Sequence, residues 1–440
     1  MVTGKKVTVI GGGLAGCEAA FQLAERDIQV TLYEMKPARF SPAHESDQLA
    51  ELVCSNSFRA NAVDSSVGLL KEEMRQLDSL IMKAARHSSV PAGKALAVDR
   101  HLFAAYITAV IGQHPHIQLV REEVVTLPDT TKEPAIMSTG PLSSEKLTAQ
   151  LVEITGEKLA FYDAIAPIVD AESLNRDIIY QKSRWDDEGP GDYLNCPMSE
   201  EEYDHFYQLL MSAETVPLKA FEQEKYFEGC LPIEVMGGRG VDTLRFGPMK
   251  PVGLDHPVTG ERFHAVVQLR AENRAGTMYN LVGFQTKLKY NEQRRVFRSI
   301  PGLEQAEFLR MGSIHRNTFI CAPALLDPWL QMKQQPGLFI AGQLSGVEGY
   351  VESAAMGLLA GINVAGLLNQ NQLPKPPPSN TALGALITHL TMSDPNHFQP
   401  SNVNFGLFPP LTKKMRKKDR GMFRAKQALE SHKQWCRNLL

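Results

Sequence analysis

The spacing of apolar side chains along the chain predicts short strands that are followed by helices. Residues 6–10 form a β-branched run, and a helical pattern follows them as far as about residue 25. A second apolar run covers residues 28–33, and two further strand-like runs cover residues 134–140 and 337–342. This order of elements favours an α/β fold.

The middle of the chain carries two helical patterns and a mixed region. Residues 67–81 repeat apolar side chains at helical spacing, which predicts one helix packed against the core. A capping box, Ser199 with Glu202, opens a second helix, whose aromatic stripe is better explained by core packing than by base stacking. Residues 161–290 mix strand and helix patterns with many turn signals, and this predicts an inserted α+β domain.

A glycine-rich segment joins the first predicted strand to the first predicted helix. It consists of Gly11, Gly12, Gly13, Leu14, Ala15 and Gly16. In this G-x-G-x-x-G pattern Gly11 allows a tight turn, Gly13 lets the backbone approach a pyrophosphate, and Gly16 permits close packing of helix on strand. Glu34 follows the second strand, where its carboxylate can bind both hydroxyls of a ribose. The segment therefore predicts a dinucleotide site.

The later strands indicate which dinucleotide is bound. Residues 134–140 and 337–342 resemble the later strands of two-dinucleotide-motif flavoproteins, in which the loop after the last strand reaches the ribityl chain. Gly342 and Gln343 end and follow that run, although such flavoproteins often carry an acid where Gln343 stands. Because no second G-x-G-x-x-G follows a strand, we expect FAD to span both ends of the chain and NAD(P)H to dock without its own Rossmann domain.

Chain length limits the number of domains. The 440 residues are about three times a usual ~150-residue domain. We expect a Rossmann-like FAD-binding domain of the two-dinucleotide-motif flavoprotein type, in two parts at residues 1–160 and 291–370, with the inserted α+β domain at residues 161–290. A proline-rich spacer and a basic segment are expected at residues 371–440.

Composition places the chain among ordinary soluble globular proteins. Hydrophobic residues make up 43% and charged residues 22%, which excludes wholesale disorder and fibrous classes. The longest nearly apolar stretch, residues 353–368, is shorter than the ~18 residues of a membrane span, and we expect it to be a buried helix. The N-terminal residues lack the apolar core of a secretory signal, so we expect a cytoplasmic protein with no membrane contact.

Cysteine usage bears on both redox state and chemistry. The six cysteines are widely spaced, with no C-x-x-C pair and no zinc-type cluster, and we expect reduced thiols and no metal site. Cys54 in ELVCSNSF and Cys230 in YFEGCLPIE stand in loop-like segments, where a thiol is accessible. These residue types alone also allow each cysteine to be a small buried apolar side chain.

Charge is unevenly distributed along the chain. The net charge is −3, but residues 411–440 hold 10 Lys or Arg against two acidic residues, so this segment carries +8 and the rest of the chain −11. Such a basic segment is an electrostatic footprint for a polyanion. It is equally typical of a solvated end helix, and charge alone leaves both interpretations open.

Longer motifs make the chain similar to a known family. It resembles the folate- and FAD-dependent tRNA (uracil-5-)-methyltransferase family over nearly its whole length. The motifs that carry this resemblance are GGGLAGCEAA, PAHESDQLAELVCSNSF, VPAGKALAVDR, DYLNCPMSEEEY, FEGCLPIE, RFGPMKPVGL, LVGFQTKLKY, HRNTFI and GVEGYVESAAMGLLAGINVA. The related glucose-inhibited division protein A family shares the flavin-binding ends but is longer, with an additional C-terminal helical domain.

The resemblance implies methylation of a uridine in the tRNA T-loop, with methylenetetrahydrofolate as carbon donor, FAD as cofactor and NADH or NADPH as reductant. Carbon 5 of uracil is a poor nucleophile that thiolate addition at carbon 6 activates, so this chemistry requires a cysteine. Cys54 and Cys230 match the family's two functional cysteines. We expect Cys230 to attack uracil, and Cys54 to remove the carbon-5 proton or to guard the flavin adduct.

Other residues are candidates for substrate contacts. His315 and Arg316 belong to the motif HRNTFI, where Arg316 would hold a folate glutamate or an RNA phosphate, or form a surface salt bridge. Contacts that position tRNA through its phosphates are expected from Lys413, Lys414, Arg416, Lys417 and Lys418. The expected partners are tRNA and the folate and nicotinamide molecules, without DNA, and the oligomeric state stays open.

Three other functions remain open at this point. The same chemistry on a ribosomal RNA uridine would use the same motifs. A small-molecule flavin oxidoreductase, acting on an amine or an acid, would need neither Cys54 nor Cys230. A non-catalytic, flavin-stabilised RNA-binding module would keep the dinucleotide site without the chemistry.

Overall fold

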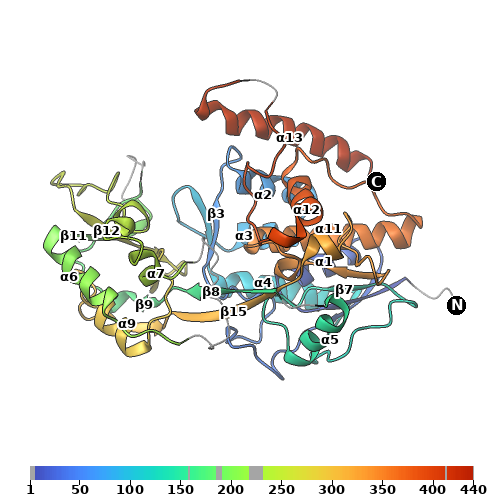
Figure 1. Cartoon of the computed structure of the whole chain (residues 1–440), viewed down its shortest axis with the longest axis horizontal. Coiled ribbons are helices and arrows are strands. Elements are labelled where there is room, and N and C mark those ends of the chain that lie inside the picture. The colour runs from blue at the N-terminus through green and yellow to red at the C-terminus, as the bar shows by residue number, and fades with distance from the viewer. Residues whose placement is uncertain (1–4, 157–158, 185–190, 218–230, 412–413, 440) are drawn as a thin grey trace.

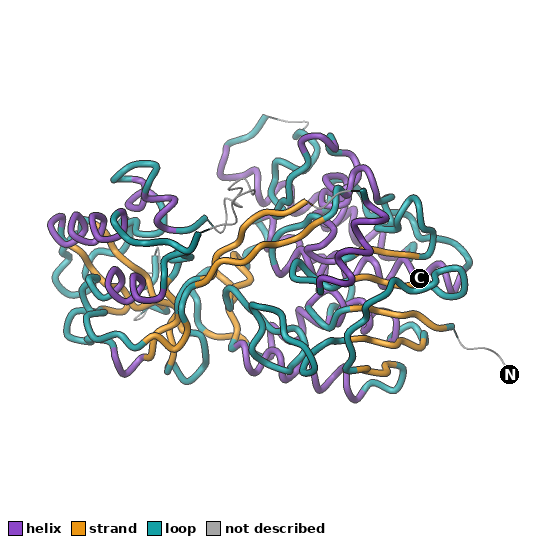
Figure 2. Tube along the Cα trace, turned by 60° about the horizontal axis from the view of Figure 1, so that its bottom comes forward, coloured by secondary structure: helices purple, strands orange, loops and turns teal. Residues whose placement is uncertain are grey.

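The chain folds into two lobes that a pair of long strands connects. The computed structural model describes residues 5–156, 159–184, 191–217, 231–411 and 414–439. In Figure 1 the larger lobe contains both ends of the chain, and the smaller lobe is built from its middle. Figure 2 shows the ribbon that runs from one lobe to the other, in which β8 (Leu159–Ile165) pairs antiparallel with β15 (Ser313–Phe319).

A five-stranded parallel sheet forms the centre of the larger lobe. Its strands, in spatial order, are β16 (Leu338–Ile340), β7 (Ala135–Met137), β1 (Lys6–Ile10), β2 (Gln29–Tyr33) and β6 (Ile117–Val120). Four of them lie within the runs that the sequence predicts, whereas β6 is not predicted. Because all five strands are parallel, their carboxyl ends meet at one edge of the sheet, which is where open α/β sheets bind ligands.

Helices α1 (Leu14–Ala24) and α11 (Tyr350–Gln370) pack closely against each other. A Cβ atom on Gly357 would lie 2.1 Å from the carbonyl oxygen of Ala15, so only glycine lets the two helices approach this far. Within the described residues, α11 is the one helix long and apolar enough to cross a membrane, but 83% of its most apolar window is buried inside the protein. It is therefore a core helix, as the sequence predicts.

Further helices and a small sheet complete the larger lobe. They are α2 (Ser66–Gln76), α3 (Leu80–His87), α4 (Arg100–Gln113), α5 (Glu145–Thr155), α10 (Ala322–Leu325), α12 (Ala382–Met392) and α13 (Arg420–Arg437), with the strands β3 (Ser57–Ala60), β4 (Ser89–Val90) and β5 (Ala95–Val98). Helix α13 lies on the outside of this lobe in Figure 1. It packs against α2 and buries Ala428, His432 and Trp435.

The prediction of one helix over residues 67–81 is wrong. Asp78 has a φ of 60°, in the left-handed region, and this ends the helical path after α2. Ser79 then caps a new helix, because its hydroxyl accepts a hydrogen bond from the Met82 N–H at 3.2 Å. The apolar spacing continues across the break, since Met74 and Ile81 are both buried, and so periodicity does not reveal it.

A six-stranded antiparallel sheet forms the smaller lobe. Its strands, in spatial order, are β10 (Tyr180–Gln181), β11 (Tyr193–Met198), β12 (Ala265–Ala271), β13 (Met278–Leu281), β9 (Ile168–Asp170) and β14 (Phe308–Arg310). Its helices are α6 (Glu200–Met211), α7 (Ile233–Gly237), α8 (Thr243–Phe246) and α9 (Tyr290–Phe297).

The core of this lobe agrees with the predicted role of the aromatic stripe. Ser199 and Glu202 form the predicted capping box at the start of α6. Tyr203 and Phe206 are buried and belong to the lobe's hydrophobic core, so the stripe packs and is not exposed for stacking. Residues 296–306 contribute to the same core. The end of the inserted domain at residue 290 stays a proposal.

Candidate active site

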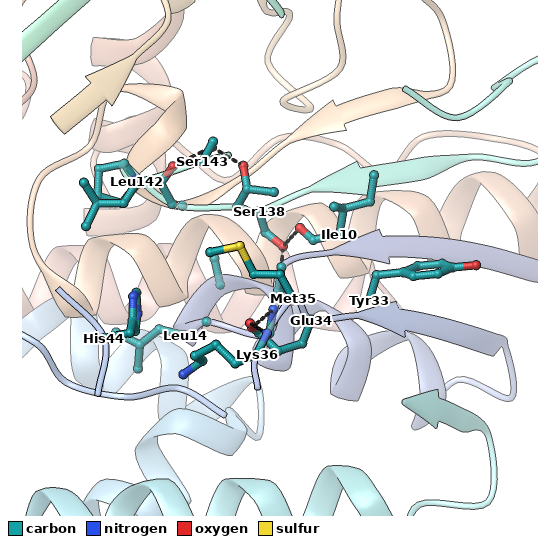
Figure 3. Close-up of a pocket in the computed structure, with 18 of the residues that line it drawn as sticks. Ile10, Leu14, Tyr33, Glu34, Met35, Lys36, His44, Ser138, Leu142 and Ser143 are labelled. Atoms are coloured by element: carbon teal, nitrogen blue, oxygen red, sulfur yellow. Dashed lines mark hydrogen bonds between the residues drawn. The ribbon is translucent and has the colours of Figure 1, made fainter. Parts of the chain in front are cut away.

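A pocket opens at the carboxyl ends of the parallel strands. The pocket and its open mouth together contain about 1120 Å³ of space, and Figure 3 shows part of its lining. Each of the five strands contributes the residues that follow it, and these are residues 10–15, 33–36, 122–124, 138–144 and 342–343. Tyr350 and Ser353, from the start of α11, close another side. A site of this size between several loops suits an extended ligand.

The glycine-rich turn leaves its backbone open to this pocket. Gly11 has a φ of 102°, and a Cβ atom there would lie 2.6 Å from the carbonyl oxygen of Ser138. A Cβ atom on Gly16 would lie 1.8 Å from the carbonyl oxygen of Gly11, so the first turn of α1 is packed directly on the loop. Around Gly13, by contrast, the described residues beyond its chain neighbours and its own helix place no heavy atom within 4 Å of the Cβ position. A phosphate group can therefore approach the backbone at Gly13.

The start of α1 supplies donors for such a phosphate. Gly13 caps the helix without a side-chain hydrogen bond, and Leu14 and Ala15 line the pocket. The N–H groups of a first helical turn have no partner within the helix, and the helix dipole adds positive potential there. This is the arrangement that binds pyrophosphate at the first turn of Rossmann folds.

Glu34 is fixed in the pocket wall by two backbone groups. Its Oε2 accepts a hydrogen bond from the Gly12 N–H at 2.9 Å, and its Oε1 accepts one from the Lys36 N–H at 2.9 Å. Figure 3 shows this carboxylate in the lining. Each carboxylate oxygen has two lone pairs, so both can still accept a ribose hydroxyl. Gly12 is required as well, because a Cβ atom there would lie 2.8 Å from Oε2 of Glu34.

The second part of the chain also lines the pocket, next to the start of α1. Gly342 has a φ of 75° and lies against Ala15, which a Cβ atom on Gly342 would approach to 2.8 Å. Gln343 stands in the lining, and its amide nitrogen donates a hydrogen bond to Oε2 of Glu348 at 2.6 Å. The residues from both ends of the chain thus meet in one pocket.

Cys54 lies beside this pocket, on the loop that follows the lining residue Val53. The Tyr350 hydroxyl oxygen accepts hydrogen bonds from the backbone N–H groups of Cys54 at 2.8 Å and of Ser55 at 3.3 Å. The same oxygen lies 3.0 Å from the Cys54 sulfur. One tyrosine therefore joins the thiol to the pocket wall.

The smaller lobe holds the same loop from the other side. Nε of Arg270, on β12, donates to the Asn56 side-chain oxygen at 2.8 Å, and Nη2 donates to the Ser55 hydroxyl at 2.9 Å. The Asn56 amide in turn donates to the carbonyl oxygens of Val98 at 3.0 Å and Ala271 at 2.9 Å. The cysteine loop is thus fixed at the junction between the lobes.

A buried ion pair lies next to this loop. The Arg100 guanidinium lies 2.6 Å from the Glu272 carboxylate, which is completely buried, and it also donates to the Leu52 carbonyl oxygen at 2.9 Å. Burial alone would lower the pKa of Arg100, but Glu272, Tyr350 and Cys54 outweigh it and raise that pKa. Arg100 is therefore a permanent positive charge near the thiol.

Sequence reasoning missed Tyr350, Arg100 and Arg270. Two of them stand inside motifs that the family resemblance uses, Arg100 at the end of VPAGKALAVDR and Tyr350 within GVEGYVESAAMG. Polar residues embedded in such motifs were therefore the available signal. Arg270 carries no such mark, because its role depends on which loop the smaller lobe meets.

The described residues do not place every predicted residue at this site. Cys230 and Lys413 lie outside the described residues. The backbone of His315 and Arg316 belongs to β15, where it pairs with residues 163 and 162, and their side chains lie outside the described part. The segment just before α13 contains the exposed residues Lys414, Arg416, Lys417 and Lys418. None of these four residues lines the pocket.

The fold and the pocket define an α/β protein of the Rossmann type that binds a dinucleotide. FAD fits this pocket, since the open backbone at Gly13, the start of α1, the Glu34 carboxylate and residues 342–343 from the later part of the chain all line it. Among solved structures, GidA from Aquifex aeolicus shares the fold, with a TM-score of 0.69 and 18% identity, over 100% of this chain and 75% of that chain. The predicted fold class is confirmed.

Comparison of sequences identifies the family of the chain. The profile of the Glucose inhibited division protein A family matches residues 6–372. A relative from Desulfotalea psychrophila, named methylenetetrahydrofolate–tRNA-(uracil-5-)-methyltransferase TrmFO, is 60% identical over 98% of this chain and 97% of its own. A relative of the same name from Geobacter sulfurreducens is 58% identical over 98% of each chain. The chain therefore belongs to the Glucose inhibited division protein A family, in its TrmFO branch, and the family resemblance seen in the sequence is confirmed.

Proposed function

We propose that this protein is an FAD-dependent methyltransferase that uses methylenetetrahydrofolate to convert the uridine at position 54 of the tRNA T-loop into 5-methyluridine. Relatives of the same length, named for this reaction, support the proposal. The observation that carries it is the position of Cys54, whose sulfur lies 3.0 Å from a hydroxyl in the wall of the dinucleotide pocket. A flavin oxidoreductase that acts on an amine or an acid does not require a thiol there.

The pocket residues divide the work of holding FAD. The backbone at Gly13 and the start of α1 bind the pyrophosphate, and Glu34 binds the ribose hydroxyls of the adenosine. Gly342 and Gln343 contact the ribityl side. Reduced FAD supplies the two electrons that a one-carbon unit needs to become a methyl group, and NADH or NADPH is the proposed source of those electrons.

Two thiols carry the chemistry on uracil. The thiolate of Cys230 adds to carbon 6, which turns carbon 5 into a nucleophile for the one-carbon unit. Cys54 removes the proton from carbon 5: the C–H bond breaks, the proton goes to the sulfur, and the electron pair stays on the ring as an enolate. When the one-carbon unit has been reduced to a methyl group, the ring electrons re-form the double bond between carbons 5 and 6. The bond from carbon 6 to the Cys230 sulfur then breaks and releases that thiolate. A base with a pKa near the working pH suits this task, and a thiol meets that requirement.

Further basic residues hold the remaining parts of the substrates. Phosphates of the tRNA are bound by Lys413, Lys414, Arg416, Lys417 and Lys418. Arg316, with His315 beside it, binds a folate glutamate or an RNA phosphate through its planar fork of donors. Since both the tRNA and reduced folates are cytosolic reactants, we place the protein in the cytoplasm.

A transfer assay tests the proposal directly. The protein is incubated with methylenetetrahydrofolate labelled in its one-carbon unit, NAD(P)H, and tRNA that lacks T-loop methylation, beside ribosomal RNA and S-adenosylmethionine controls. Label in 5-methyluridine of the T-loop is the expected result, lost in Cys54→Ser but kept in the matched cysteine variant Cys436→Ser. Label only in ribosomal RNA would contradict the proposed acceptor, and reducible flavin without any label transfer would point to a small-molecule oxidoreductase.

A further inference from the structure

The hydrogen bonds around the Tyr350 hydroxyl determine where its proton points. A backbone N–H can only donate, so the hydroxyl oxygen is the acceptor in its bonds to Cys54 N at 2.8 Å and Ser55 N at 3.3 Å. These two bonds occupy the lone pairs of the oxygen, which leaves little capacity to accept a third hydrogen from the thiol. Among the described residues, the Cys54 sulfur at 3.0 Å is the acceptor within reach of the O–H.

We propose that Tyr350 is a positioning residue for Cys54. The Tyr350 hydroxyl donates its phenolic hydrogen to the Cys54 sulfur and so stabilises the thiolate. This rests on the proposed function, because a base that takes the carbon-5 proton must be present as thiolate. A hydrogen bond to the charged form of a group lowers its pKa, and a bond between a hydroxyl and an anion is stronger than a neutral one. Tyr350 acts through Cys54 and keeps its own proton.

The surroundings of Tyr350 support this direction of the bond. Burial, together with the neighbouring Cys54, raises the pKa of Tyr350 well above that of a free phenol. The phenol therefore stays protonated throughout the pH range in which thiols titrate, and it can serve as a donor to the sulfur. A proton shuttle through Tyr350 itself would require the phenolate, which burial disfavours.

Two positive charges and one negative charge face the cysteine loop. Arg100, on α4, lies close enough that Cys54 and Tyr350 both contribute to its raised pKa, so it stabilises negative charge on the sulfur in return. Its partner Glu272 opposes this effect, but is neutralised by the ion pair of 2.6 Å. Arg270, from β12, adds a second positive charge through its bond to the Ser55 hydroxyl at 2.9 Å.

The position of Tyr350 also connects the thiol with the flavin site. It is the first residue of α11 and lines the dinucleotide pocket, and its ring lies 5.9 Å from the ring of the buried Phe58. The centre of the Phe58 ring in turn lies 5.4 Å from that of the Phe103 ring, so aromatic packing holds the Tyr350 ring in position. Because the ring is fixed by packing, its hydroxyl keeps the sulfur at one place beside the pocket.

The substitution Tyr350→Phe tests the assignment, because it removes the hydroxyl and leaves the ring. The rate of Cys54 alkylation by iodoacetamide is measured between pH 6 and 10 on the FAD-loaded protein, with peptide mass spectrometry to separate Cys54 from the other cysteines. The midpoint of this profile reports the pKa of Cys54, whereas its plateau reports access of the reagent. We expect the midpoint to rise by about one unit, and alkylation at pH 7 to become about tenfold slower.

Two comparisons keep this test decisive. Tyr106→Phe removes a tyrosine hydroxyl from α4 that does not line the pocket, and its midpoint is expected to equal that of the wild type. Tyr350→3-fluorotyrosine keeps the hydroxyl and makes it a stronger donor, so the midpoint is expected to fall, even if the phenylalanine variant does not bind FAD. An unchanged midpoint in both Tyr350 variants would overturn the proposal. The profile involves no RNA or folate, so this outcome is distinct from failure of methyl transfer.

Discussion

At the scale of single residues, the glycines of the first turn serve different physical purposes. Gly13 has a φ of −78°, which alanine adopts easily, and its Cβ position faces open pocket space. A Cβ atom on Gly16 would clash with the carbonyl oxygen of Gly11, at a distance of 1.8 Å. One glycine is therefore needed by the ligand and the other by the fold.

This difference makes a prediction about two alanine variants. Gly13→Ala is expected to keep the thermal stability of the FAD-free protein but to bind FAD at least about tenfold more weakly, because the methyl group occupies the place of the phosphate. Gly16→Ala is expected to lower the free energy of unfolding by roughly 1–3 kcal/mol or more, since helix and loop must separate. Calorimetry and flavin fluorescence titration measure both effects. Equal stability losses in the two variants would contradict the assignment.

The same scale shows what sequence could predict about the site. The glycine turn and Glu34 are local in sequence and have a strict spacing, and Cys54 stands in a recognisable motif. The hydroxyl that contacts Cys54 comes from a residue 296 positions away, and its role exists only once α11 is placed beside the cysteine loop. Contacts of this kind arise from the tertiary fold, so residue patterns alone do not reveal them.

At the scale of elements, α13 is attached to the larger lobe by a buried histidine. His432 is completely buried, and its Nδ1 lies 3.2 Å from the side-chain oxygen of Gln76 on α2. Burial lowers the pKa of His432 to about 4, whereas an unfolded histidine titrates near 6.5. The unfolded chain thus binds this proton more strongly than the folded one.

This pKa shift predicts that acid weakens the attachment of α13. The stabilising contribution is complete above about pH 6.5 and is lost as the pH falls towards 4, and at pH 5 the loss is about 2 kcal/mol. The rate of proteolytic cleavage in the C-terminal helix, compared at pH 7 and pH 5, measures this loss of stabilisation. His432→Gln is expected to remove the difference between the two pH values, whereas His397→Gln, at a side chain that is 85% exposed, is expected to retain it. Equal acid sensitivity in His432→Gln would refute this account.

The elements that sequence missed share a physical reason. Strands β4 and β10 have two residues each, so they exist because a neighbouring strand pairs with them and not because of their own composition. The break between α2 and α3 depends on one residue, Asp78, in a left-handed conformation within a continuous apolar pattern. Long periodic elements such as α11 were predictable, because burial of a whole face is recorded in the residue order.

At the scale of the whole molecule, the lobes meet through the buried pair of Arg100 and Glu272. Arg100 begins α4 in the larger lobe, and Glu272 directly follows β12 in the smaller one. Removing one partner leaves a buried charge, so Glu272→Gln is expected to lower the free energy of unfolding by about 3–5 kcal/mol. The double variant Arg100→Met, Glu272→Leu is expected to recover most of this loss. Urea denaturation of the single and double variants measures the coupling, and additive losses would contradict it.

The distribution of charge over the molecule leads to the last prediction. The exposed residues Lys414, Lys417 and Lys418 precede α13, and α13 lies on the side of the molecule opposite α5 in Figure 1. Each phosphate contact contributes roughly 0.7–0.9 to the log–log slope of RNA affinity against salt. Replacing all three lysines with glutamine is therefore expected to flatten the slope for tRNA by about 2–3.

Salt titrations of tRNA binding measure that slope, and a control variant removes two lysines that lie outside the basic segment. Replacing Lys146 on α5 together with the exposed Lys132 removes positive charge without touching the basic segment. If the segment before α13 forms the footprint, the control slope equals that of the wild type, because distant exposed charges are screened beyond about 10 Å at 0.1 M salt. A control slope that flattens in proportion to its two removed charges would mean that affinity depends on net charge alone, and the basic segment would then have no specific role in tRNA binding.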